Sequence, residues 1–195
     1  MMSATRNSRT GRLIVISAPS GCGKTTVVSC WLKQRRSLKR SVSYTTRMRR
    51  PGERGGKDYY FVGERKFRRL TKRNFFLEWA RVFGEWYGTP KHRCFAQVRR
   101  GLDLVLAIDV RGARQVRRHC RGRIPLITIF IMPPSLGALK KRLLHRKTDS
   151  LREVKKRLLE AAREMRARKE YDRVVVNDRL GACVRRIDRL VYGGR

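Results

Sequence analysis

Acidic side chains are scarce in this chain of 195 residues, which has 15 Asp and Glu against 50 Lys and Arg and a formal net charge of +35. A surface of this composition attracts polyanions such as nucleotides and nucleic acids. The basic residues are spread along the whole chain, and no recognised nucleic-acid-binding motif accompanies them. Two interpretations of the charge therefore stay open, weak non-specific nucleic-acid binding and a compositional bias of the source proteome.

Long apolar runs and paired cysteines are also missing. No stretch approaches the ~20 apolar residues of a membrane span, which predicts a soluble protein without membrane contact. Five cysteines without paired spacing argue against a complete disulfide framework and favour a reducing cytoplasm. The three histidines lie far apart and no Cys-x-x-Cys occurs, so no zinc site is expected. The first twelve residues are basic, but so is the rest of the chain, and they do not stand out as a targeting segment.

A short apolar segment, residues 13–17, is followed by a glycine-rich turn and then by apolar residues at helical spacing. This order predicts a buried strand, a phosphate-binding loop and a helix. Residues 18–25 match G-x-x-x-x-G-K-S/T except that Ala18 takes the place of the first glycine. We expect Lys24 to reach the β- and γ-phosphate oxygens of ATP and the Thr25 hydroxyl to be a ligand of Mg²⁺.

The backbone N–H groups of this loop and the N-terminus of the helix would surround the polyphosphate. The residues expected to bind ATP here are Ala18, Pro19, Ser20, Gly21, Cys22, Gly23, Lys24, Thr25 and Thr26. Cys22 has two interpretations. It is either a thiol whose ionisation is favoured by the helix N-terminus and Lys24, or a small residue that fills space.

The remaining pattern alternates strands with helices, which predicts an α/β fold with a parallel sheet covered on both faces. Strands are expected at 41–46, 76–83, 102–109, 126–131 and 173–176, and helices at 64–71, 111–119, 136–145, 150–168 and 180–192. Between the second strand and the first of these helices lies a long loop that begins at Arg47, is rich in glycine and charge, and closes on aromatic residues. Loops of this length are usually functional or disordered, and the aromatic residues favour function.

Two carboxylates are candidates for chemistry. Glu78 lies among aromatic residues, so it is either an exposed strand carboxylate or an acceptor of hydrogen bonds from a bound base. Asp109 ends an apolar strand, which is where many phosphate-loop enzymes place an aspartate near Mg²⁺.

Taken together, these motifs resemble a bacterial-type guanylate kinase, of the P-loop nucleoside monophosphate kinase group. The resemblance covers nearly the whole chain from Gly11 and rests on residues 18–25, 41–47, 56–59, 76–79, 87–89, 108–109, 133–135 and 175–178. It implies a P-loop parallel sheet flanked by helices, with an inserted GMP-binding segment and a helical lid. It also implies transfer of the γ-phosphoryl of MgATP to GMP in the cytoplasm.

The resemblance further implies a role for each matching residue. The GMP phosphate would be bound by Ser43, Arg47, Arg50, Tyr59 and Tyr87, and the guanine would be recognised by Glu78 and Thr89. Asp109 would lie between base recognition and the metal, with the metal contact made through water, and Asn177 would line the adenine pocket. The lid would supply Arg142, Arg146 and Arg157, which act with Lys24, Arg47 and Arg50 as the catalytic cations.

By the same resemblance, residues 1–10 form a basic tail and residues 11–195 a single kinase-like domain. Its core would be 11–43, 90–134 and 167–195, with the GMP-binding segment at 44–89 and the lid at 135–166. The chain departs from the family pattern at Ala18, Ala107, Lys147 and Arg179. Ala107 puts support for Asp109 in doubt, and Lys147 follows Arg146 where glycine is usual.

Three alternatives remain at this point. One is a related small-molecule kinase of the ribose bisphosphate kinase type, against which Tyr59, Glu78 and Tyr87 argue. The second is a non-enzymatic guanylate-kinase-like scaffold module, which would usually have lost the phosphate loop that Lys24 and Thr25 preserve. The third is an RNA-binding protein driven by charge alone.

Overall fold

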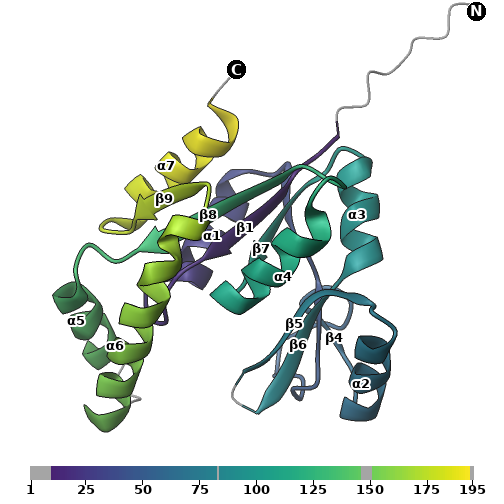
Figure 1. The fold of residues 1–195 in the computed structure, drawn as a ribbon, viewed down its shortest axis with the longest axis horizontal. Helices are drawn as coiled ribbons and strands as arrows, with labels where there is room; N and C mark the ends of the chain where they lie inside the picture. Colours follow the sequence, from purple (N-terminus) through teal and green to yellow (C-terminus); the bar gives the residue numbers. More distant parts are fainter. Residues whose placement is uncertain (1–9, 83, 146–150, 194–195) are drawn as a thin grey trace, which may run out of the picture. The chain divides into compact units, whose positions relative to one another are not determined.

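A computed structural model describes residues 10–82, 84–145 and 151–193 of the chain (Figure 1). The strands are β1 (Leu13–Ser17), β2 (Leu38–Arg40), β3 (Ser43–Thr45), β4 (Tyr59–Phe61), β5 (Phe76–Val82), β6 (Glu85–Pro90), β7 (Asp103–Ala107), β8 (Leu126–Met132) and β9 (Arg173–Val176). The helices are α1 (Lys24–Gln34), α2 (Glu64–Lys72), α3 (Lys91–Arg99), α4 (Val110–Cys120), α5 (Leu136–His145), α6 (Leu151–Arg166) and α7 (Leu180–Tyr192), with a 3-10 turn, η1, at Ala167–Glu170. No helix of this described part is long and apolar enough to cross a membrane.

The larger sheet has five strands in the order β2-β7-β1-β8-β9. β8 and β9 run parallel, with Ile129 opposite Arg173 and Met132 opposite Val176. β7 also runs parallel to β1. The Leu104 N–H donates to the carbonyl of residue 12 and the Ile108 N–H to the carbonyl of residue 16, so the two segments advance in the same direction. The predicted α/β fold with a parallel sheet is therefore confirmed.

A smaller sheet of four strands, in the order β4-β3-β6-β5, was not predicted from the sequence. β3 pairs parallel to β4 and antiparallel to β6, and β5 and β6 form an antiparallel hairpin around residue 84. The expected strand at 41–46 is thus shorter and belongs to this sheet. β6 and α3 lacked a sequence signal because Gly88 and Pro90 interrupt the strand pattern and the helix begins directly after that proline.

The chain divides into two compact units. The first contains the chain up to Leu13 with Ser37–Leu104 and Gln115–Leu126, and the second contains Ile14–Arg36, Val105–Arg114 and the chain from Ile127 onward.

Aromatic packing forms the centre of the first unit. Phe67 of α2 stacks on Phe76 of β5 with ring centroids 4.6 Å apart, and Trp86 of β6 lies 6.0 Å from Phe67. Phe67 and Phe76 are buried. This packing holds α2 against the smaller sheet that carries the predicted GMP-binding residues.

In the second unit, α1 packs against α7. The Trp31 indole N–H donates to Asp188 Oδ1 at 2.8 Å, and Arg35 donates to both oxygens of that carboxylate at 2.5 and 2.6 Å. Elsewhere in this unit, Phe130 of β8 packs against Val110 and Ala167. The contacts of Trp31 and Arg35 with Asp188 hold α1, the helix that leaves the phosphate loop, against α7.

All five cysteines are free. Four of them are buried, and Cys30 is half-buried. Burial raises the pKa of Cys22, Cys94 and Cys183 to about 11 and that of Cys120 to about 12. The four buried sulfurs are therefore neutral thiols at physiological pH.

Candidate functional site

The phosphate loop has the backbone that its glycines predict. Gly21 and Gly23 have φ angles of 86° and 82°, in the left-handed region where a Cβ is unfavourable. A Cβ on Gly21 would also lie 2.7 Å from the Leu143 side chain of α5. The fully buried strand β1 therefore turns within a few residues into α1, which begins at Lys24.

Two side chains hold the loop in place. The Lys24 ammonium group donates to the Ile108 carbonyl at 2.9 Å, at the end of β7. The Asn177 side-chain amide donates to the Cys22 carbonyl at 2.9 Å, and Asn177 is buried. The predicted ATP-site residue Asn177 thus contacts the phosphate loop directly, although it is more than 150 positions away in sequence.

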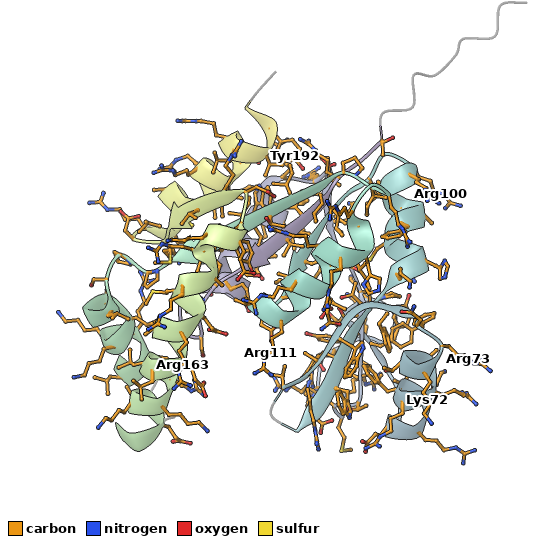
Figure 2. The ribbon with its side chains drawn as sticks, in the orientation of Figure 1. Lys72, Arg73, Arg100, Arg111, Arg163 and Tyr192 are labelled. Carbon is orange, nitrogen blue, oxygen red and sulfur yellow. The ribbon has the colours of Figure 1, made fainter. Side chains whose placement is uncertain are left out.

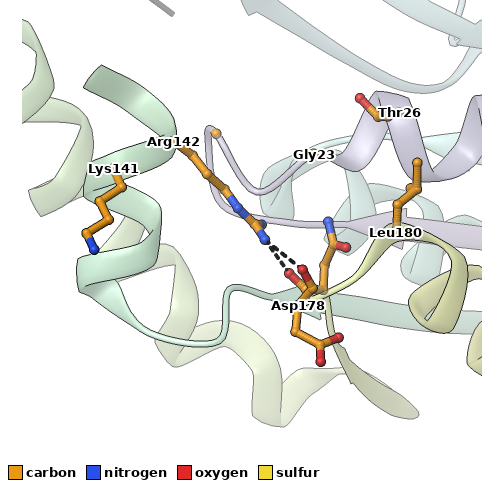
Figure 3. A pocket seen from close by; sticks show the side chains of 8 residues that line it. Gly23, Thr26, Lys141, Arg142, Asp178 and Leu180 are labelled. Atoms are coloured by element: carbon orange, nitrogen blue, oxygen red, sulfur yellow. Dashed lines mark hydrogen bonds between the residues drawn. The ribbon is translucent and has the colours of Figure 1, made fainter. Parts of the chain in front are cut away.

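A cavity of about 580 Å³ opens beside the loop. It is lined by Gly21, Gly23, Thr26, Lys141, Arg142, Asn177, Asp178 and Leu180. Figure 3 shows Arg142 reaching from α5 toward the segment after β9, where it donates to the carbonyls of Asn177 at 2.7 Å and Asp178 at 3.3 Å. The cavity therefore combines loop amides, cationic side chains and a polar edge, as a nucleotide site requires.

The predicted lid arginines have different outcomes. Arg142 lines the cavity beside the loop. Arg157 is half-buried on α6. Arg146 lies outside the described residues, as does Lys147.

Two further residues of the loop region are Cys22, for which the sequence left two interpretations open, and Glu164, which the sequence analysis did not single out. Burial of Cys22 raises the pKa of its thiol to about 11, which excludes the ionised thiol and leaves the space-filling interpretation. Glu164 of α6 accepts a hydrogen bond from the Ser20 backbone N–H at 3.3 Å. Burial raises the pKa of Glu164, although Ser20 and Lys24 act in the opposite direction.

Asp109 was expected at the end of a strand over 102–109, but β7 ends at Ala107 and Asp109 directly precedes α4. Its Oδ1 accepts a hydrogen bond from the Gly112 N–H at 2.7 Å in the first turn of α4, so the carboxylate has a fixed orientation. Thr25 is exposed in the first turn of α1. Asp109 belongs to the second unit, whereas the other predicted GMP residues belong to the first, so its contact with GMP stays a prediction.

Three predicted base-site and phosphate-site residues are hydrogen-bonded together in the first unit. The register of β5 and β6 places Glu78 opposite Thr89, and the Thr89 hydroxyl donates to Glu78 Oε1 at 2.5 Å. The Ser43 and Thr89 hydroxyls lie 3.3 Å apart. Glu78 is only 5 % exposed, which excludes the interpretation as an exposed strand carboxylate.

A second cluster in the first unit contains Arg47, Tyr59 and Tyr87. The Arg47 guanidinium lies 5.6 Å from the Tyr59 ring centroid, and the Tyr59 and Tyr87 rings are 6.0 Å apart. The hydrogen bonds that Arg47 makes with Glu53 and Tyr87 raise its pKa, Glu53 having the larger effect. Arg50 is exposed in the adjoining turn. An arginine and two phenols that converge in this way can bind a phosphate dianion.

Glu53 is the residue of this cluster that sequence reasoning missed. Its Oε1 accepts from Arg47 Nη2 at 2.7 Å, and its Oε2 accepts from the Arg50 backbone N–H at 2.9 Å. A signal was present, because an acid between several arginines of so basic a chain is a natural ion-pair partner. Its effect on the two arginines could not be read without the geometry of the turn.

Comparisons with known proteins agree with this arrangement. A family profile described as "Guanylate kinase" matches residues 10–192. The guanylate kinase of Dechloromonas aromatica (strain RCB) is 47% identical over 89% of this chain and 85% of its own length. That of Synechococcus sp. (strain JA-3-3Ab) is 42% identical over 93% of this chain and 82% of its own. The crystal structure of guanylate kinase from Anaplasma phagocytophilum superposes with a TM-score of 0.73, at 34% identity, over 94% of this chain and 86% of that chain.

Proposed function

The chain belongs to the guanylate kinase family, and from this premise we propose how its residues share the transfer of the γ-phosphoryl group of ATP to GMP. As a nucleoside monophosphate kinase, the enzyme yields ADP and GDP. The observation that carries the proposal is the intact phosphate loop, with Lys24 at the start of α1 and a nucleotide-sized cavity beside it.

ATP binds to the second unit in this proposal. The loop amides from Gly21 to Thr26 contact the β- and γ-phosphates, and Lys24 exchanges its hydrogen bond with the Ile108 carbonyl for phosphate oxygens. The adenine occupies the cavity near Asn177 and Arg142, the former held against the loop and the latter against residues 177 and 178. Arg146 and Arg157 contribute charge from the lid.

GMP binds to the first unit. The Glu78 carboxylate is a suitable acceptor for the N1–H and amino donors of guanine, and Thr89 and Ser43 fix its orientation. Arg47, Arg50, Tyr59 and Tyr87 bind the phosphate through charge-assisted hydrogen bonds.

The residues present also fit Mg²⁺ carried by ATP. Such an ion takes few protein ligands and keeps its waters and the phosphate oxygens of the substrate. Thr25 supplies a hydroxyl beside the loop and Asp109 an oriented carboxylate, while the described residues contain no cluster of three or more His, Cys, Asp or Glu that would form a closed protein cage. When bound, the ion would be held on the protein side by the Thr25 hydroxyl and Asp109, and it would supply positive charge that offsets the charge of the ATP phosphates.

No general base is needed, because the GMP phosphate is already an anionic nucleophile. The contribution of the chain is to orient the two nucleotides, to neutralise charge through Lys24 and the arginines, and to exclude water. Movement of the lid and of the GMP-binding segment completes the site in this proposal.

A coupled assay that offers GMP, AMP, CMP and UMP in turn with ATP tests the proposal. We expect turnover with GMP that exceeds turnover with the other three by orders of magnitude and that stops when EDTA removes Mg²⁺. Equal turnover of AMP and GMP, or turnover that resists EDTA, would contradict it. A ribose bisphosphate as the preferred acceptor would favour the related small-molecule kinases.

We also propose weak non-specific binding of nucleic acid, because a net charge of +35 favours polyanions. Lys72 and Arg73 at the end of α2, and Arg163 on α6, extend away from their helices (Figure 2).

The five free cysteines favour a cytoplasmic location, which cell fractionation tests.

A further inference from the structure

We propose that Glu53 is a positioning residue, which holds Arg47 and the backbone at Arg50 in the arrangement that receives the GMP phosphate. This inference rests on the proposed function, because it requires Arg47 and Arg50 to bind that phosphate. It adds a residue that the resemblance did not assign and that has no contact with the substrate in the proposal.

The Glu53 carboxylate uses its two oxygens for two different parts of the loop. Oε1 accepts from the Arg47 guanidinium at 2.7 Å, and Oε2 accepts from the Arg50 backbone N–H at 2.9 Å. The Glu53 N–H in turn donates to the Arg50 carbonyl at 3.2 Å, which closes a turn over residues 50–53. One side chain therefore determines both the direction of the Arg47 guanidinium and the conformation of the chain at Arg50.

The surroundings of this pair differ from those of an ordinary surface ion pair. The side chains of Arg47 and Glu53 are 15% and 21% exposed, whereas the helical pair Arg68–Glu64 is 67% and 51% exposed. The guanidinium also lies 5.6 Å and 5.9 Å from the ring centroids of Tyr59 and Phe61. Partial burial and a second hydrogen-bond partner make the contact stronger than an isolated surface pair.

The hydrogen bond to Glu53 leaves donors for a substrate. A guanidinium has five N–H groups in a fixed fork. The contact with Glu53 involves Nη2, and Nη1 donates to the Met48 carbonyl at 2.7 Å. The hydrogen bond from Arg47 is the main reason that the pKa of Glu53 is lowered, so the carboxylate stays ionised and keeps its hold at neutral pH. Because the fork is already oriented, less rotamer freedom is lost when a phosphate binds.

Glu53→Ala tests this inference, with GMP and guanosine as paired ligands. Guanosine has the same base and lacks the phosphate, so a residue that acts through Arg47 and Arg50 affects binding of GMP only. We expect the affinity for GMP to fall about tenfold or more, as for the loss of a charge-assisted hydrogen bond. We expect the affinities for guanosine and ATP to stay within about twofold of the unchanged chain, and KM for GMP to rise more than kcat falls.

Glu53→Gln is the conservative variant, because an amide oxygen still accepts from Arg47 while the NH₂ group cannot accept from the Arg50 N–H. It should give an intermediate loss. Glu64→Ala is the matched control, since it removes a carboxylate that is ion-paired with Arg68 in the same unit. It should leave the ratio of GMP to guanosine affinity unchanged, and retained guanosine binding shows that the first unit of each variant is folded, as retained ATP binding does for the second.

The outcomes separate this inference from the function on which it rests. Unchanged or tighter GMP binding by Glu53→Ala would show that the carboxylate does not position Arg47, or competes with the phosphate, and would overturn the inference. An equal loss for guanosine would overturn it too, because the effect would then be general. If Arg47→Ala also leaves GMP binding unchanged, the assignment of Arg47 to the phosphate fails as well. A loss for Arg47→Ala alone leaves the assignment standing and overturns only the role of Glu53.

Discussion

Lys24 combines two tasks at the start of α1. Its ammonium group is held 2.9 Å from the Ile108 carbonyl, at the end of a buried strand, and in the proposed complex it neutralises phosphate oxygens. Lys24→Ala should therefore leave the fold nearly intact and lower kcat on the order of a hundredfold or more, because a charge is lost that stabilises the transition state. Steady-state kinetics with GMP and ATP, together with a thermal unfolding curve, measure the two effects.

Lys33→Ala provides the comparison for Lys24→Ala. It removes the same charge from the exposed last turn of the same helix, and it should have little effect on kcat. Near-normal turnover of Lys24→Ala would contradict the assignment of the loop.

Glu78 determines which base is accepted in our proposal. Glu78→Gln replaces an acceptor oxygen with a donor NH₂ group, facing a base that also donates. A site built around a hydrogen bond can reject an analogue that lacks it by about 10⁴. We therefore expect the preference for GMP over AMP to fall sharply, mainly through a higher KM for GMP.

Glu85→Gln is a suitable control for Glu78→Gln, because Glu85 is on the paired strand and accepts from the Thr46 hydroxyl at 2.6 Å. Its base preference should not change. The role of Glu78 fails if the GMP to AMP ratio is the same in Glu78→Gln as in the unchanged chain.

Single residues show what a sequence can predict of the site. The spacing around Lys24 and Thr25 identifies a phosphate loop because the whole motif is local in sequence. The burial of Glu78 was harder to predict. It depends on pairing with β6, and Gly88 and Pro90 interrupt the strand pattern of that segment in the sequence. The roles of Glu53 and Glu164 were missed. Glu53 accepts from the Arg50 N–H in a turn and Glu164 from the Ser20 N–H of the phosphate loop, and the sequence alone does not show which backbone groups a side chain contacts.

At the scale of elements, one carboxylate joins α1 to α7 through several hydrogen bonds. Asp188 on α7 accepts from Trp31 and Arg35 at the C-terminal end of α1, and the hydrogen bond from Arg35 is the main cause of the lowered pKa of Asp188. Asp188→Asn should lower the free energy of unfolding by about 1–2 kcal/mol at pH 7, a value reduced because the side chain is partly exposed.

The sign of the pH dependence follows from the direction of that shift. A carboxyl whose pKa is lower in the folded state stabilises the fold above its unfolded pKa, about 3.9. This contribution to stability is lost as the pH falls through the pKa that the carboxyl has in the folded state. The difference between the unchanged chain and Asp188→Asn should therefore shrink in acid, as urea unfolding at pH 7 and below pH 4 can measure. Glu160→Gln, at an exposed position of α6, is the control, and a difference that persists in acid would refute the role of the ion pair.

Elements with a clear apolar pattern were predicted with nearly their observed bounds. β1, β9, α5 and α7 agree with the expected ranges, because the two strands are short apolar runs, the two helices have apolar residues at helical spacing, and glycine, proline or polar residues bound them. The three-residue strands β2, β3 and β4 are too short to show a period. The sheet that β3 and β4 form with the β5–β6 hairpin depends on pairing between distant segments, which local pattern does not encode.

The whole molecule is dominated by its charge. Screening at physiological salt acts over about 8 Å, so we expect scattered Lys and Arg to influence anionic nucleotides as a long-range field, whereas Arg47 and Arg142 act by contact in our proposal. Raising KCl should lower kcat/KM for both substrates and change kcat less. Any bound RNA should inhibit at low salt and be released over the same range of salt. Initial rates from low to moderate KCl, with and without RNA, measure both effects, and absence of RNA binding at low salt would leave the charge as a compositional bias.

The four buried thiols also determine how this protein withstands oxidation. An oxidant attacks the thiolate rather than the thiol, and it must first reach the sulfur. While the chain is folded, burial keeps four thiols un-ionised and out of reach of an oxidant, namely those of Cys22, Cys94, Cys120 and Cys183. Cys30 is the more accessible sulfur. Peroxide damage at the sulfur of Cys22, in the middle of the phosphate loop, therefore depends on how often the fold opens, so the conformational stability of the protein is also the protection of its active-site loop.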